Sequence, residues 1–122
     1  MNNASSLFTG KGMTCIEVAE VLAYESSEPI TYEGVLKPLI FEPICASCHS
    51  PSGTMSTRNW LDYSTAQQHA RNIASKVWGE MPPQGAEVRQ LTTAEKELLQ
   101  KWVEAGTPRG TGPIPAVLNC EK

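Results

Sequence analysis

Residues 40–50 read Ile40-Phe41-Glu42-Pro43-Ile44-Cys45-Ala46-Ser47-Cys48-His49-Ser50, and they contain the most informative spacing in the chain. Two residues separate the cysteines, and a histidine directly follows the second cysteine. On a helical turn, this spacing presents both sulfur atoms along one side, next to the imidazole. The stretch therefore predicts a binding site, and the remaining residues are interpreted around it.

Cys-x-x-Cys-His is the pattern of covalent haem attachment. In such a site the thiols of Cys45 and Cys48 add to the two vinyl groups of one haem. His49 then binds the iron as its proximal ligand. The sequence thus predicts one covalently bound haem c held by these three residues.

Two other kinds of site also use a Cys-x-x-Cys pair. A thioredoxin-like redox pair lies at a helix N-terminus within a βαβ unit, whereas this motif ends a helix-like segment. A structural zinc site needs four ligands, usually in two separated pairs. The remaining zinc candidates are distant from the motif and from one another: Cys15, Cys120 and His69. Haem attachment is favoured, with a zinc site as the alternative.

The sixth position of a haem iron requires a second axial ligand, and Met81 is the predicted one. It lies in Gly79-Glu80-Met81-Pro82-Pro83, where the prolines restrict the backbone and fix the direction of the side chain. A thioether ligand raises the reduction potential. Core packing is the alternative role for Met81. His69 is the rival ligand, and it would give bis-histidine iron of lower potential; its alternative role is that of a partly solvated surface histidine.

Four segments have helical signals. Residues 14–25 begin with a capping-box pattern, Thr14 with Glu17, and form a short helix or a strand. Residues 38–48 form a helix with Pro38 in its first turn. A third helix runs from Ser64, paired with Gln67, to about Gly79. A fourth is capped by Thr92 with Glu95 and ends at Gly106. The apolar positions predicted to be buried are Leu39, Ile40, Ile44, Ala66, Ala70, Ile73, Val77, Leu98, Leu99, Trp102 and Val103.

Composition limits the class of protein. The chain has 122 residues, which favours one domain. Hydrophobic residues make up 40% and aromatic residues 7% of the chain, so a core of side chains alone is thin. The net charge of −3 and the lack of a Lys/Arg run argue against nucleic-acid binding. No apolar run approaches the roughly 20 residues that span a bilayer.

With these motifs, the chain resembles class I mono-haem cytochromes c. The resemblance rests on residues 40–50, on Met81-Pro82-Pro83 and on the closing helix from Leu91-Thr92 to Gly106 with its Trp102. It implies an all-α fold of three to five helices wrapped around one haem, with Leu36 or Ile40 against Leu99 and Trp102. It covers residues 34–109. Residues 1–33 form an N-terminal extension, with a flexible arm over 1–13, and residues 110–122 form a Gly/Pro-rich tail that returns to it.

The resemblance also implies a function. With His49 and Met81 on the iron, the protein is an electron carrier between donor and acceptor proteins, a monomer and not an enzyme. Trp60, Arg58 and Arg71 are candidate partners of the haem propionates. Two alternatives are open: the electron-transfer subunit of a larger oxidoreductase, and a haem-based sensor or ligand-binding protein whose sixth position is open or displaceable.

Cys15 and Cys120 are left over once the haem takes its pair, and we predict a disulfide between them. Two unrelated free thiols are the alternative. Covalent haem attachment implies an oxidising setting outside the cytoplasm, where disulfides persist. The residues at the N-terminus have no secretory signal pattern. We therefore expect a periplasmic or otherwise exported protein whose signal peptide has been removed.

Overall fold

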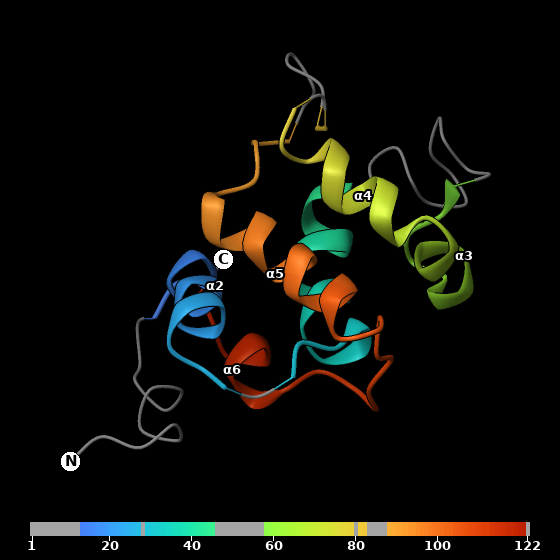
Figure 1. Ribbon diagram of the computed structural model, residues 1–122. Coiled ribbons are helices and arrows are strands. Elements are labelled where there is room, and N and C mark those ends of the chain that lie inside the picture. Colours follow the sequence, from blue (N-terminus) through green and yellow to red (C-terminus); the bar gives the residue numbers. More distant parts are fainter. Residues whose placement is uncertain (1–12, 28, 46–57, 80, 83–87, 122) are drawn as a thin grey trace.

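The computed structural model describes residues 13–27, 29–45, 58–79, 81–82 and 88–121 (Figure 1). Its elements, in chain order, are α2 (Cys15–Tyr24), η1 (Tyr32–Cys45), α3 (Tyr63–Gln68), α4 (Ala70–Lys76), α5 (Thr93–Glu104) and α6 (Pro115–Leu118). Over these residues the only β-type pairing is an isolated bridge between Thr14 and Glu121. The prediction of an all-α chain is confirmed at this level. None of the helices in the described ranges is long and apolar enough to cross a bilayer.

Helix α2 begins where its capping box predicts. The Thr14 hydroxyl accepts from Glu17 N at 3.1 Å, and the Glu17 carboxylate accepts from Thr14 N at 2.9 Å. These hydrogen bonds with Thr14 lower the pKa of the Glu17 carboxyl below its ordinary value. Because both orphan donors are satisfied, the segment is a helix rather than a strand. Its buried side, which includes Val18 and Leu22, belongs to the main core, and the helix packs against α5 (Figure 1).

Element η1 differs from the prediction of a helix that starts at Pro38. It starts six residues earlier and is a π-helix with Pro38 and Pro43 inside it. Leu36 N donates to the carbonyl of Thr31, five residues back, at 3.2 Å. A proline inside an α-helix removes a donor and meets the carbonyl four residues back. Bonding to the fifth residue back winds the helix more widely, and this is the conformation that the proline-containing segment adopts.

The predicted third helix is two helices, α3 and α4, separated at His69. Its N-cap is Asp62 rather than Ser64: the Asp62 carboxylate accepts from Thr65 N at 2.9 Å. Hydrogen bonds from Thr65 hold the pKa of this carboxyl below its ordinary value. An ionised carboxylate is the stronger acceptor for an N-terminal amide, which explains the shift of the start. The four predicted apolar positions, Ala66, Ala70, Ile73 and Val77, are all buried.

Helix α5 confirms its prediction closely. Thr92 and Glu95 form the capping box, and Leu98, Leu99 and Trp102 are fully buried. The helix ends before Gly106, which has φ of +89° and so adopts the left-handed conformation that glycine allows without a steric penalty.

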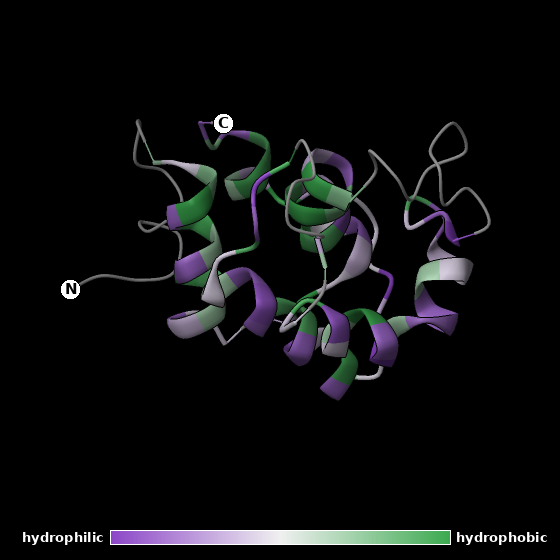
Figure 2. Ribbon diagram, turned by 90° about the horizontal axis from the view of Figure 1, so that it is seen from above, coloured by the Kyte–Doolittle hydropathy of each residue, from purple (hydrophilic) through white to green (hydrophobic). Residues whose placement is uncertain are grey.

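The core lies between η1, α2 and α5 and includes the buried side chains of α3 and α4. The rings of Phe41 and Tyr32 on η1 lie 6.3 and 6.2 Å from the ring of Trp102 on α5, measured between centroids. The indole Nε1 of Trp102 donates to the carbonyl of Pro108 at 3.0 Å, so its polar atom is satisfied although the residue is fully buried. Figure 2 shows that the outer faces of the helices, which point away from this core, carry the hydrophilic residues.

The C-terminal segment runs along η1 back to α2. Tyr32 N donates to Pro108 O at 2.9 Å, and Ile114 N donates to Gly34 O at 3.2 Å. A Cβ on Gly34 would come within 2.5 Å of Thr31 Oγ1, so a side chain does not fit there without a rearrangement.

The first described residue, Met13, was predicted to belong to the arm. It is instead half-buried against the core, and its carbonyl accepts from Glu121 N at 2.9 Å. The division of the chain into a domain at 34–109 with two extensions stays a prediction.

Candidate cofactor site

Cys45 is the last residue of η1. It is half-buried and packs against the hydrophobic core, next to the buried Ile44. Cys48 and His49, the other two predicted haem-binding residues, lie outside the described residues. The structure therefore places one of the three motif residues, at the end of an element whose buried side includes Ile40, Phe41 and Ile44.

Met81 follows α4 and is half-buried. Its backbone N–H donates to the carbonyl of Lys76 at 3.0 Å, and Gly79 N donates to the same carbonyl at 3.0 Å. The next residue, Pro82, is buried, and the peptide bond between the two is cis. The end of α4 thus fixes the backbone of Met81.

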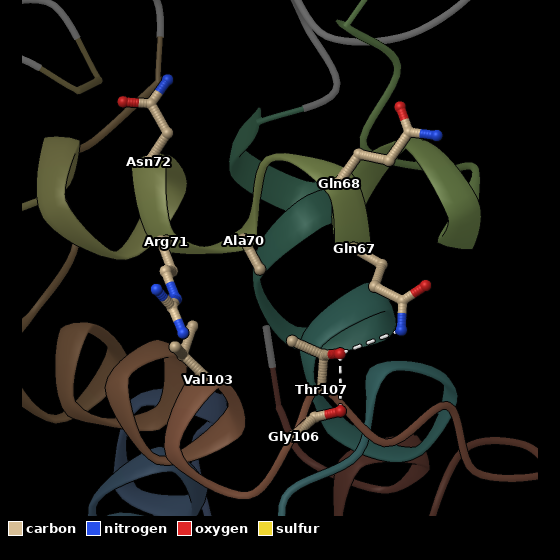
Figure 3. Close-up of a pocket in the computed structure, with 8 residues that line it drawn as sticks. All are labelled: Gln67, Gln68, Ala70, Arg71, Asn72, Val103, Gly106 and Thr107. Carbon is tan, nitrogen blue, oxygen red and sulfur yellow. Dashed lines mark hydrogen bonds between the residues drawn. The ribbon is translucent and has the colours of Figure 1, made fainter.

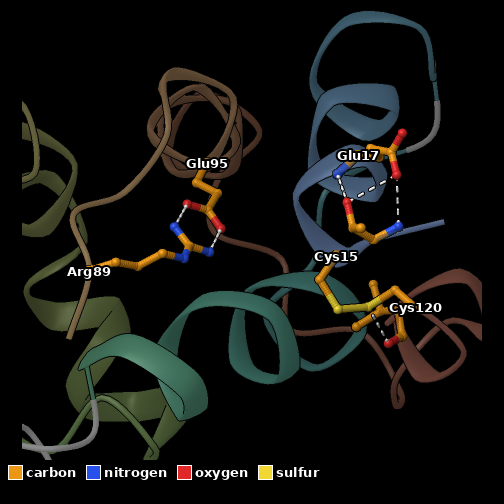
Figure 4. Close-up of a disulfide and its surroundings, with 7 residues drawn as sticks. Cys15, Glu17, Arg89, Glu95 and Cys120 are labelled. Carbon is orange, nitrogen blue, oxygen red and sulfur yellow. Dashed lines mark hydrogen bonds and ion pairs between the residues drawn. A yellow bond between two sulfur atoms is a disulfide. The ribbon is translucent and has the colours of Figure 1, made fainter. Parts of the chain in front are cut away.

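On its C-terminal side, Met81 is connected to the start of α5. The carbonyl of Pro82 accepts from Gln90 Nε2 at 2.7 Å. The Arg89 guanidinium makes two bonds of 2.7 Å to the carboxylate of Glu95, which is fully buried (Figure 4). It also donates to Gln90 O at 3.0 Å. Hydrogen bonding to Glu95 raises the pKa of Arg89. The sequence analysis missed Gln90, because nothing in its local pattern marks a contact eight residues back.

His69, the rival ligand, lies between α3 and α4 and is half-buried. Its ring is 5.3 Å from that of Trp60, measured between centroids. Trp60 is buried, and its carbonyl accepts from the hydroxyl of Tyr32 at 2.7 Å. Burial raises the pKa of this Tyr32 hydroxyl. Arg58, a candidate propionate partner close to Trp60, is exposed.

The third propionate candidate, Arg71, lines a pocket of about 490 Å³ between α3, α4 and the end of α5 (Figure 3). Gln67 Nε2 donates to Thr107 Oγ1 at 3.1 Å and to the Tyr63 hydroxyl at 3.0 Å. Neither Cys45 nor Met81 lines this pocket. The polar side chains that line it are three amides, one hydroxyl and one guanidinium, which are no set of ligands for a metal.

The remaining two cysteines, Cys15 and Cys120, form a disulfide with their Cα atoms 4.9 Å apart (Figure 4). Beside it lies a groove of about 830 Å³ lined by η1 and by Val88 and Arg89. Across the described ranges, no three His, Cys, Asp or Glu side chains gather in a way that could hold a metal ion. In the disulfide form, Cys15 and Cys120 carry no thiolate and so are not zinc ligands.

Comparisons with models of protein families, with curated proteins and with solved structures find no match for this chain.

Proposed function

We propose that this protein transfers electrons through one covalently attached haem c. Cys45 and Cys48 form the thioether bonds, His49 is the proximal ligand of the iron and Met81 is the distal ligand. The observation that carries the proposal is the division of the four cysteines. Cys15 and Cys120 bond to each other across 105 residues, so the pair in the Cys-x-x-Cys-His motif is separate from the structural bridge.

The described ligand residues fit such a group. Cys45 ends η1, Met81 lies five residues after the last residue of α4, and both sulfur-containing side chains are half-buried. Cys45 packs against the core, and the Met81 backbone is bonded on both sides, through Lys76 and through Pro82. The Met81 thioether with its restrained backbone suits a haem iron, and the Cys45 thiol suits the thioether bond to the edge of the haem.

A bound haem supplies the one-electron change between Fe(III) and Fe(II). The chain's residues hold it and set its properties: Cys45 and Cys48 fix its edge, and His49 and Met81 occupy both axial positions. With both positions taken by protein, no site for a substrate remains, so we propose a carrier rather than an enzyme. The Met81 thioether favours the reduced iron and so raises the potential.

The setting follows from the same chemistry. Haem attachment through thioethers and a disulfide between Cys15 and Cys120 both belong to an oxidising compartment, so we propose a periplasmic or otherwise exported monomer. Its partners are a donor and an acceptor protein that dock in small, transient interfaces.

The first test is production in a host that matures c-type cytochromes, followed by haem and iron analysis. We expect one haem per chain that stays attached under denaturing conditions. The variant with Cys45→Ala and Cys48→Ala should lose it. The matched control, Cys15→Ser with Cys120→Ser, should keep it. An unaltered chain without haem, or one that holds zinc, contradicts the proposal.

The second test concerns the sixth position. The oxidised protein should show the weak sulfur-to-iron absorption band, and Met81→Ala should lose it. The reduction potential should then fall by on the order of 100 mV, within the about 0.8 V range that axial ligands span. Met13→Ala, a second half-buried methionine, is the control and should change neither. Carbon monoxide binding to the reduced, unaltered protein favours a sensor instead. Co-purification with a catalytic chain at fixed stoichiometry favours a subunit of an oxidoreductase.

A further inference from the structure

We propose that Gln90 is the positioning residue for the Met81 ligand. The inference rests on the proposed function, since it concerns how the chain holds the distal ligand of that haem. Gln90 Nε2 donates to the carbonyl of Pro82 at 2.7 Å, so its bond lies one residue away from Met81. The side chain of Gln90 does not touch the iron in this proposal and acts through the backbone of Met81 and Pro82.

The backbone around Met81 is held by different kinds of hydrogen bond on its two sides. On the N-terminal side, Met81 N is bonded to Lys76 O at the end of α4. This hydrogen bond joins two backbone atoms at the end of a helix, so it does not depend on the side chains of the residues it connects. On the C-terminal side, the bond comes from the Gln90 side chain, so a substitution can remove it without touching the backbone.

Gln90 is itself held in place by a hydrogen bond from its neighbour Arg89. Arg89 Nη1 donates to Gln90 O at 3.0 Å, and the Arg89 guanidinium is bonded twice to the buried carboxylate of Glu95. Glu95 also accepts from Thr92 N at 2.8 Å in the capping box of α5. A continuous series of hydrogen bonds therefore runs from the N-terminus of α5 to the residue after Met81. It fixes Gln90 against a helix that is packed into the core.

The position of a metal ligand decides whether it binds. A thioether binds iron only when its sulfur is held near the axial direction, and residues that orient a ligand contribute to its binding. Loss of the Gln90 bond frees the carbonyl of Pro82 and lets the Met81 segment move away. Since the Gln90 side chain is exposed, its replacement leaves the core intact, and the change is confined to this segment.

The test uses holoprotein of the unaltered chain and of three variants. Gln90→Ala removes the donor, and Gln90→Glu keeps the size but replaces the donor with an acceptor. Gln90→Lys keeps a donor of similar reach. Gln100→Ala is the matched control, because Gln100 on α5 donates only within its own helix, to Glu104 at 3.3 Å. The readouts are the sulfur-to-iron band, the reduction potential and the affinity of the oxidised iron for added imidazole.

We expect Gln90→Ala and Gln90→Glu to weaken the band and lower the potential. Imidazole should bind about tenfold more tightly to these variants, because it competes with a less well-held thioether; tenfold equals about 1.4 kcal/mol. Gln90→Lys and Gln100→Ala should resemble the unaltered chain. Haem content should be equal in all, because Cys45, Cys48 and His49 are unchanged.

The outcomes separate this inference from the proposed function. If the band is present in the unaltered chain and unchanged in Gln90→Ala, the positioning role is overturned and the ligation by Met81 stands. If Gln90→Lys behaves like Gln90→Ala, the hydrogen bond is not the cause and the inference is likewise overturned. An unaltered chain without the band overturns the ligation by Met81, and the role of Gln90 with it.

Discussion

Two regions of this molecule are held in contrasting ways. The terminal region, residues 13–24 and 114–121, is tied by the disulfide between Cys15 and Cys120 and by backbone bonds on both sides of Glu121. The Met81 segment, residues 81–82 with 88–92, has no covalent bridge among its described residues. Met81 N is bonded to the Lys76 carbonyl, and the Gln90 side chain joins the two parts of the segment through Pro82. The Arg89 side chain connects the segment to Glu95 on α5, and Leu91 is buried in the core.

Because of this difference, substitutions in the two regions should affect different properties of the protein. In the terminal region the two ends of the chain are joined by a disulfide and by hydrogen bonds between backbone atoms, so a single substitution leaves most of these bonds in place. In the Met81 segment the bonds to α5 depend on individual side chains, each of which a substitution can remove. Substitutions there can adjust Met81, the ligand that we propose, without disturbing the core, whereas changes in the terminal region act on the stability of the whole fold.

Removal of the disulfide should have the largest effect on stability. Cys15→Ser with Cys120→Ser opens a loop of 105 residues, which in the chain-entropy model lowers the free energy of unfolding by about 4–5 kcal/mol. Urea denaturation measures it, and reduction of the unaltered chain should give the same loss. The sulfur-to-iron absorption band that we propose for Met81 should not change. Two reactive thiols in unfolded, unreduced protein would show that the bridge is not formed.

Glu95→Ala comes next and acts on the Met81 side of the comparison. It removes two bonds from Arg89 and one from Thr92 N, all to a fully buried carboxylate. Hydrogen bonds to charged groups are worth about 1.5–3 kcal/mol, so we expect a loss of that order in urea denaturation. Glu104→Ala, on the exposed end of the same helix, is the control and should cost at most about 0.5 kcal/mol. Equal losses in the two variants would contradict the role of the buried pair.

The two capping boxes offer a smaller and more direct comparison. Thr14→Ala removes the cap of α2, and Thr92→Ala removes the cap of α5; loss of an N-cap costs typically about 1 kcal/mol. The bridge at Cys15 restrains the start of α2 in both the folded and the unfolded chain. We therefore expect the smaller loss for Thr14→Ala in thermal unfolding. A larger loss for Thr14→Ala than for Thr92→Ala would mean that the bridge does not support this end.

The smallest effect is a dependence on pH at Glu17. Its folded pKa lies below the ordinary 4.5 because Thr14 donates hydrogen bonds to the ionised form. The stabilisation is thus present above about pH 4.5 and is lost as pH falls through the lowered value. Glu17→Gln should be less stable than the unaltered chain at pH 7, and the difference should vanish in acid. Asp62→Asn should follow the same trend at α3. A difference that is independent of pH would refute the explanation.

Local patterns predicted the elements whose determinants lie within one helical turn. The capping boxes at Thr14 and Thr92 set the starts of α2 and α5, because donor and acceptor are three residues apart. The prediction failed where a distant group takes part or where a second local cap competes. The start of η1 at Tyr32 is stabilised by Pro108 O, and the start of α3 uses Asp62, a neighbour that the Ser64 pattern did not include.

The residues of the candidate site show the same distinction between local and long-range determinants. Cys45 and Met81 were identifiable because their neighbours in sequence, Cys48 and His49 in one case and Pro82 in the other, carry a chemical pattern. Gln90 was not identifiable, since its partner Pro82 becomes a neighbour only when the chain folds back onto the start of α5.

The sequence by itself determined the helical character of the chain, the caps and the motif from Cys45 to His49, because each depends on groups a few residues apart. The sequence also predicted the pairing of Cys15 with Cys120, with free thiols as the alternative, and the tertiary structure decided between the two. Only the tertiary structure decided that Arg89 pairs with the buried Glu95 and that Gln90 reaches Pro82. The bridge and the bond from Gln90 join groups that the unfolded chain holds apart. Arg89 and Glu95 are close in sequence, but the Glu95 carboxylate becomes buried only when α5 packs into the core. The physical reason is that burial and long-range proximity arise when the core forms around Trp102, and no local spacing encodes them.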